Sequence, residues 1–134
     1  MRQGLVGLLA LVGVLVGCAH AQARREEAAV ARRLAYIDEV RGPATIPSGA
    51  AARMVVVGSL PDPSWALAGV EQRREGRVVR LLPWLQRTTE EPVIQVLVPF
   101  EHEVMLGVLP PGRWEVQVVG FGDALATAAL EVTP

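Results

Sequence analysis

Short segments in which apolar and polar residues alternate dominate the chain from Tyr36 onward. The clearest is residues 114–118, where Trp, Val and Val alternate with Glu and Gln. A period of two residues is typical of a strand with one buried face. Clusters of Gly, Pro, Ser and Asp separate these segments, and such clusters end strands and form turns. About seven short strands at this spacing predict an all-β fold, an antiparallel β-sandwich.

The expected strands cover residues 36–40, 53–60, 67–74, 77–82, 93–98, 103–109, 114–118 and 126–132. Glu75 and Gly76 separate two of them and predict a hairpin turn. Residues 93–98 form an apolar run interrupted by Gln95 alone, which predicts a buried strand.

The N-terminal residues have the parts of a secretory leader. Arg2 is positively charged, residues 5–16 are an apolar core, and Gly17 is a small residue at the cleavage position. The apolar stretch is shorter than the roughly 20 residues of a membrane-spanning helix. We therefore expect residues 1–17 to be a cleaved signal peptide.

The end of this leader, Leu15-Val16-Gly17-Cys18, resembles the lipobox of bacterial lipoproteins. The resemblance implies that Cys18 becomes the mature N-terminus and is acylated, palmitate included, and that the acyl chains hold the protein on a membrane. Ala19 rather than Asp follows the cysteine, which implies the periplasmic side of the outer membrane or the cell surface. We expect residues 18–34 to be a polar, helix-compatible tether and residues 35–134 to be the β-domain.

Charge and cysteine content limit the functions open to the mature chain. Loss of Arg2 with the leader leaves twelve of the thirteen basic residues against fourteen acidic ones, a net charge of −2. This balance argues against nucleic acid as a partner. Cys18 is the single cysteine, so no disulfide can form within one copy.

Residues 109–118, with the sequence LPPGRWEVQV, resemble a signature that precedes a late strand in bacterial immunoglobulin-like and fibronectin-III-like domains. Residues 58–62, the hairpin at 74–77 and residues 97–101 follow the order found in small Ig-like lipoprotein domains. The resemblance covers roughly residues 35–134. It implies an Ig-like sandwich that binds, spaces or scaffolds. A family disulfide is not implied, because this chain lacks both of the cysteines concerned.

Five residues are candidates for contact with a partner. Trp65 and Trp84 lie beside prolines in expected loops, and exposed loop tryptophans often anchor a protein contact. Phe121 lies in the last turn, and Arg73 and Arg77 belong to an arginine cluster on the expected hairpin, where an ordinary charged surface is the alternative. Trp114 is expected in the core. The alternative for Trp65 and Trp84 is that they cap the ends of that core.

The sequence gives no strong sign of catalysis, a metal or a cofactor. Glu101, His102 and Glu103 are adjacent, but on a strand His102 points away from both glutamates, so the three cannot share one ion. Gly120 and Gly122 lack the third glycine of a dinucleotide fingerprint, and too few residues follow for a βαβ unit. We therefore expect no enzyme activity, no metal and no cofactor.

These observations predict a lipid-anchored envelope module whose sandwich binds or scaffolds a protein partner. An alternative is a protease-inhibitor-like module, which would bring the loops of Trp65 and Trp84 together at one end of the sandwich. A hydrolase is the third and weakest hypothesis.

Overall fold

The computed structural model describes residues 31–134, which form one all-β unit. Its strands are β1 (Arg32–Leu34), β2 (Tyr36–Arg41), β3 (Thr45–Pro47), β4 (Ala51–Leu60), β5 (Trp65–Glu75), β6 (Val78–Arg87), β7 (Val98–Val108), β8 (Gly112–Val119) and β9 (Leu125–Thr133). A short 3-10 turn, η1 (Phe121–Asp123), joins β8 to β9. The predicted signal peptide and Cys18 lie outside the described residues. Within residues 31–134 no helix is long and apolar enough to cross a membrane.

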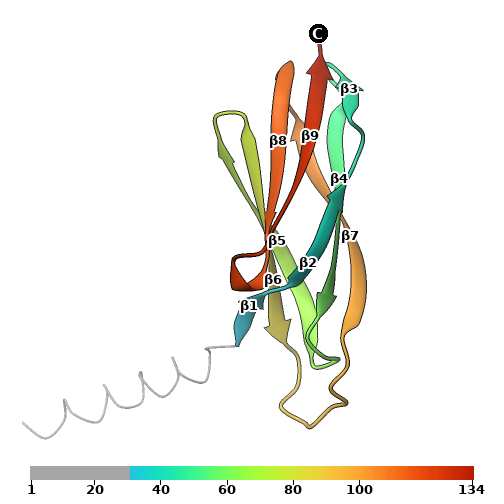
Figure 1. The fold of residues 1–134 in the computed structure, drawn as a ribbon, viewed down its shortest axis with the longest axis vertical. Coiled ribbons are helices and arrows are strands. Elements are labelled where there is room, and N and C mark those ends of the chain that lie inside the picture. The colour runs from blue at the N-terminus through green and yellow to red at the C-terminus, as the bar shows by residue number, and fades with distance from the viewer. Residues whose placement is uncertain (1–30) are drawn as a thin grey trace, which may run out of the picture. The chain divides into compact units, whose positions relative to one another are not determined.

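The strands form two sheets that face each other as a sandwich (Figure 1). The larger sheet has the order β1-β6-β8-β9-β3, with β5 on the other edge of β6, and the smaller has the order β2-β4-β7. The predicted all-β sandwich is confirmed. Most neighbouring strands are antiparallel, but β6 and β8 are parallel, as are β3 and β9. β6 and β8 are parallel because the strand between them, β7, lies in the opposite sheet. β7 carries the chain back to the end of the sandwich where β6 began.

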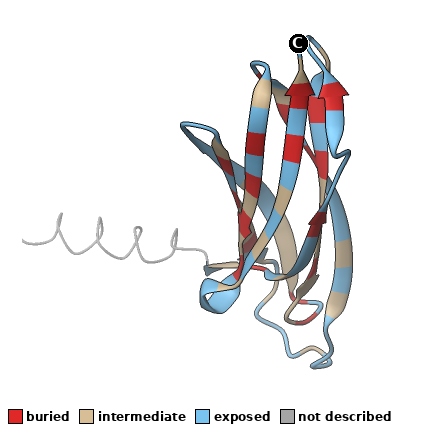
Figure 2. Ribbon diagram, turned by 45° about the horizontal axis from the view of Figure 1, so that its top comes forward, coloured by how far each residue is buried: buried red, intermediate tan, exposed pale blue. Residues whose placement is uncertain are grey.

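Alternate residues of both sheets build the core between them (Figure 2). The smaller sheet contributes Met54 and Val56, which are at most 1% exposed, and the larger sheet contributes Leu81, Val116 and Leu130, which are fully buried. Trp114 is 3% exposed, so its predicted place in the core is confirmed. Burial of these apolar side chains stabilises the contact between the sheets.

The predicted hairpin is present as β5 and β6. Glu75 pairs with Val78, so Gly76 and Arg77 form a two-residue turn. Gly76 has a φ of 56°, and glycine adopts this positive value without steric cost. A glycine at the first turn position suits the twist of a hairpin.

The prediction for residues 93–98 is wrong. Only Val98 belongs to a strand, and Ile94 and Leu97 are 75% and 62% exposed. The reason is the length of the neighbouring strand: Val98 pairs with Leu60, the last residue of β4, after which Pro61 turns that chain away. Residues before Val98 therefore lack a partner in the smaller sheet.

The domain begins earlier than its predicted boundary at residue 35. Residues 32–34, assigned to the tether, form β1 and pair with Trp84, Leu85 and Gln86 of β6. Their sequence has little apolar character, so pairing with the edge of β6 rather than local propensity makes them a strand.

We expect the core to carry most of the stability of the domain. Leu130 and Leu125 both lie in β9, but Leu130 is fully buried and Leu125 is 58% exposed. Leu130→Ala should lower the free energy of unfolding by about 2–5 kcal/mol because it leaves a cavity. Leu125→Ala should change it by less than about 0.5 kcal/mol. Urea titrations followed by tryptophan fluorescence measure both, and equal losses would contradict this assignment of the core.

Candidate functional site

Trp84 lies within a strand, not in the expected loop. Pro83 precedes it in β6 although proline cannot donate a backbone hydrogen bond. The sheet accommodates Pro83 because the partner of β6 changes there: β8 pairs up to Leu81, and β1 pairs from Trp84 onward. The carbonyl of Pro83 accepts a hydrogen bond of 3.0 Å from the amide of Ala35. A proline next to Trp84 therefore does not mark a loop.

Trp84 is the centre of a group on the outer face of the larger sheet. We call Arg32, Glu71, Arg73 and Trp84 the Trp84 patch. The indole Nε1 of Trp84 donates to Glu71 Oε2 at 3.0 Å. The Arg73 guanidinium donates to the other oxygen, Oε1, from Nε at 3.2 Å and from Nη2 at 3.1 Å. The guanidinium of Arg32 lies over the Trp84 ring, 5.4 Å from its centre.

Glu71 holds this patch together. The hydrogen bond from Trp84 and then that from Arg73 lower the pKa of Glu71 below its ordinary value, against a smaller opposing effect of desolvation. Glu71 therefore stays ionised at neutral pH and fixes the orientation of both neighbours. A shallow hollow beside it is lined by Arg32, Gly69, Val70, Glu71 and Trp84.

Trp65 and Phe121 belong to a different group. The guanidinium of Arg33 lies 3.8 Å from the ring centre of Phe121, 4.9 Å from that of Tyr36 and 5.8 Å from that of Trp65. The ring of Tyr36 meets that of Phe121 edge to face at 5.6 Å. Arg33 thus ties β1 to η1 and to the start of β5 through cation–π contacts. These contacts favour a structural role for Trp65 and Phe121.

The two candidate tryptophans lie on opposite faces of the larger sheet. Trp65 pairs with Arg87, whereas Trp84 pairs with Gly69. Positions 84 and 87 are an odd number of residues apart on β6, so their side chains point in opposite directions. Adjacent residues of β1 follow the same rule, since Arg32 contacts Trp84 and Arg33 contacts Trp65. Trp65 and Trp84 therefore do not form a pair of loops at one end of the sandwich.

The same alternation divides the arginine cluster of the hairpin. Arg73 pairs with Arg80. Arg74 and Arg77 lie over the Trp114 ring at 5.4 and 5.2 Å instead. Arg77 Nη1 also donates to the carbonyl of Pro111 at 2.8 Å. Arg77 thus covers the end of the core, and Arg73 is the arginine of this cluster that belongs to the Trp84 patch.

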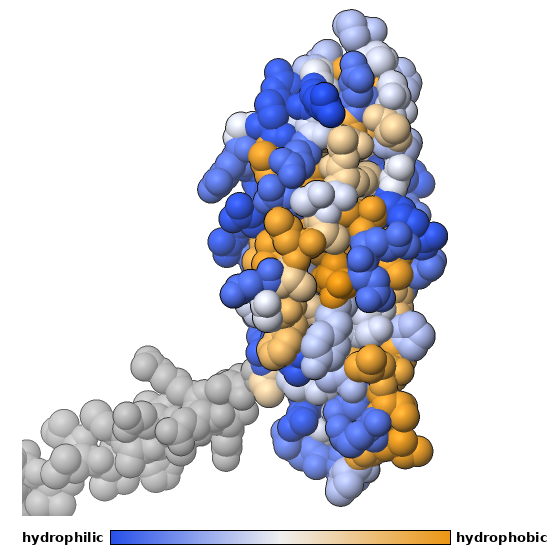
Figure 3. Space-filling model, viewed as in Figure 1, coloured by the Kyte–Doolittle hydropathy of each residue, from blue (hydrophilic) through white to orange (hydrophobic). Residues whose placement is uncertain are grey.

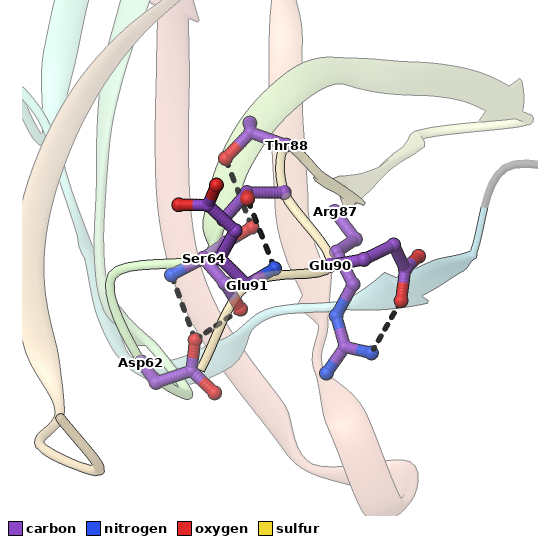
Figure 4. Close-up of polar contacts among 7 residues, drawn as sticks. Asp62, Ser64, Arg87, Thr88, Glu90 and Glu91 are labelled. Atoms are coloured by element: carbon purple, nitrogen blue, oxygen red, sulfur yellow. Dashed lines mark hydrogen bonds and ion pairs between the residues drawn. The ribbon is translucent and has the colours of Figure 1, made fainter. Parts of the chain in front are cut away.

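Asp62 and Ser64 are the buried polar residues of the described part, 5% and 3% exposed. Oδ1 of Asp62 accepts from both the amide and the hydroxyl of Ser64, the amide at 2.7 Å (Figure 4). The hydroxyl bond is the main cause of a lowered pKa at Asp62. Thr88 donates to the carbonyl of Ser64 from its amide at 2.7 Å and from its hydroxyl at 3.0 Å. This network fixes the β4–β5 turn to the start of the β6–β7 loop.

The residues between 31 and 134 contain no group of three or more potential metal ligands. Glu101 pairs instead with Arg41, at 2.6 Å, and Glu103 with Arg53, at 3.4 Å. Glu101, His102 and Glu103 occupy exposed positions of β7, and the two arginines belong to β2 and β4. The glutamates therefore form an exposed, ion-paired face.

Sequence reasoning missed Glu71, Arg32 and Arg33 as members of these two groups. A signal existed for Glu71, because residues 71 and 73 share one face of an expected strand. Its contact with Trp84 follows only from the register in which Glu71 faces Leu82. The polar composition around Arg32 and Arg33 predicts a tether, so the sequence gives no signal for their contacts.

The fold and these surfaces define an all-β sandwich domain with polar and aromatic side chains on its outer faces. A family model, that of the ORF11 beta-sandwich domain, matches residues 54–131, from β4 to β9. The match covers more than half of the chain, and the protein belongs to this family. No curated protein and no solved structure matched the chain.

The lowered pKa of Glu71 gives the Trp84 patch a pH dependence. Because the pKa is lower in the folded protein, the stabilising contribution of Glu71 is complete above its ordinary value, about 4.3. It is lost as the pH falls through the lowered pKa. We expect the NMR resonance of the Trp84 indole proton to shift with a midpoint below about 4.3. Glu71→Gln should abolish this shift, and a midpoint above the ordinary value would contradict the assigned contacts.

Proposed function

We propose that this protein is a lipid-anchored, non-catalytic binding module of the bacterial cell envelope. Cys18 carries the acyl chains, and the sandwich presents the Trp84 patch to a protein partner. The leader sequence and its lipobox resemblance support the anchor. They also favour the periplasmic side of the outer membrane or the cell surface as the location.

The observation that carries the binding role is the arrangement of Trp84 on the outer sheet face. Its indole is half-buried and held by Glu71, with Arg32 and Arg73 beside it. Tryptophan and arginine are the residues most enriched among those that dominate the affinity of protein interfaces. Side chains that are already oriented lose less conformational entropy when a partner binds.

The shape of the surface favours a protein over a small molecule. Small-molecule sites are concave and enclose most of their ligand. The hollow beside Trp84 lies on the outer face of the sheet and is shallow, and Gly69 and Val70 contribute to its lining. A flat face with one tryptophan and charged neighbours suits a partner that contributes a complementary surface.

The anchor is tested by replacing the acylated residue. Cys18→Ser should abolish incorporation of radiolabelled palmitate and release the protein from washed membranes, because the mature chain would have no thiol to acylate. Arg53→Gln, on the smaller sheet, is the control and should leave both properties unchanged. Palmitate label that persists in Cys18→Ser would overturn the anchor.

The partner surface is tested by purification of the tagged, acylated protein in mild detergent, with identification of bound proteins by mass spectrometry. Trp84→Ala should weaken the complex about 30-fold, the effect of a strong interface residue at about 2 kcal/mol. Arg73→Gln should weaken it less.

Arg53→Gln is the matched control for Arg73→Gln, since both arginines are exposed and each pairs with a glutamate. It should bind normally. Recovery of the protein alone, or equal binding by all variants, would contradict a partner at the Trp84 patch. Circular dichroism establishes that each variant is folded.

A further inference from the structure

The loop between β6 and β7 presents aliphatic side chains to solvent. Ile94 is 75% exposed, Val96 is 49% exposed and Leu97 is 62% exposed. We call this connection, residues 88–97, the apolar loop; its tip, residues 93–97, has Gln95 as its single polar side chain. Figure 3 shows one hydrophobic area at the lower right, at the end where β7 begins, besides that in the middle of the molecule. Contiguous apolar groups on a monomer commonly mark a contact with a protein or a membrane.

The apolar loop has a defined shape. At its base, Thr88 donates to the carbonyl of Ser64. Further along, the Glu91 amide donates to the Thr89 hydroxyl at 3.1 Å. Near the tip, the Val96 amide donates to the carbonyl of Ile94 at 3.1 Å. These bonds order the backbone that carries the exposed aliphatic side chains, so less ordering is needed when they are covered.

The loop starts where the chain enters the domain. The amide of Arg87, the last residue of β6, donates to the carbonyl of Ala31 at 3.2 Å. Residue 31 and the base of the loop are therefore held together. The C-terminus lies at the opposite end of the sandwich (Figure 1). The end with the apolar loop is thus the end from which the chain leads back toward Cys18.

The length of chain between Cys18 and this end limits its distance from an anchor. Thirteen residue steps separate Cys18 from Ala31. They span at most about 45 Å when fully extended, and about 20 Å as a helix. An anchor at Cys18 would therefore keep the apolar loop within reach of the same bilayer.

We infer that the apolar loop inserts into the interfacial region of the bilayer that holds the Cys18 anchor. The inference rests on the acylation proposed above. Loop backbone has polar groups that the hydrocarbon core does not tolerate, so insertion is shallow. The aliphatic side chains enter the boundary between headgroups and acyl chains, as the apolar faces of interfacial segments do.

The charges around the loop select the lipid. Glu90 and Glu91 precede its tip, and Glu90 pairs with Arg87 at 3.9 Å. Glu101 and Glu103 follow it and pair with Arg41 and Arg53, so the charges next to the tip are largely balanced and include no run of basic residues. Such a segment lacks the basic residues that attract anionic lipids. The surface therefore fits a zwitterionic bilayer, with the carboxylates remaining in water.

The test places a spin label in the loop of the full mature chain, acylated at Cys18 and reconstituted in phosphatidylcholine vesicles. Ile94→Cys carries the label. Val108→Cys, at the other end of β7 and 59% exposed, is the matched control. We expect oxygen to collide with the label at position 94 more often than a water-soluble nickel chelate does. The label at position 108 should show the reverse.

The other outcomes separate the loop from the anchor. Intact mass first verifies that the chain is acylated. If the labels at positions 94 and 108 are then equally accessible to nickel, the inference is overturned and the anchor is unaffected. Dipolar broadening between the labels of two chains would show that the loop contacts a second copy. A label shielded from nickel in native envelopes but not in pure lipid would show that the loop contacts another protein. Either result would overturn insertion into the bilayer. A chain without acyl groups would overturn the proposed function. Cys18→Ser combined with Ile94→Cys then leaves position 94 as the single labelled thiol, and its accessibility reports the loop independently.

Discussion

The pairing and burial of β6 determine where Trp84, β1 and the apolar loop lie in this domain. Its inward side chains Val79, Leu81, Pro83 and Leu85 are buried. One edge of β6 pairs with β5, and the other pairs first with β8 and then with β1. Because the inward residues are fixed by the core, the outward direction of Trp84 is fixed as well. The same strand ends at Arg87, where the chain from residue 31 and the apolar loop meet.

Buried and exposed interactions have different roles in this sandwich. The apolar core supplies stability, since its residues are removed from water in both sheets. The ion pairs on the outer faces, such as Arg53 with Glu103, are exposed and contribute little. The Trp84 patch differs from such pairs because one carboxylate, Glu71, orients two neighbours. Under the proposed function its value lies in orienting side chains for a partner rather than in holding the fold.

The two proposals assign different faces of the domain to different contacts. The apolar loop lies at the end from which the chain leads toward Cys18, and the Trp84 patch lies on the outer face of the larger sheet. A domain that rests on lipid through its end would leave that sheet face open to a protein. The lipid contact would thus restrict the orientation in which the partner meets Trp84.

Much of the fold followed from the sequence because a strand with one buried face leaves a period of two residues. Residues 114–118 showed this period, and the hairpin at Gly76 had its own turn signal. The apolar run at residues 93–98 was misassigned because burial depends on a neighbouring strand, and β4 ends at Leu60.

The candidate site was less predictable. Trp84 and Arg73 were visible as residue types, but Glu71 joins them only through the register of β5 and β6. By itself the sequence determined the all-β class, the core face of β8 and the lipobox resemblance at Cys18. Only the tertiary structure decided which strands became neighbours, because pairing depends on residues that lie far apart along the chain.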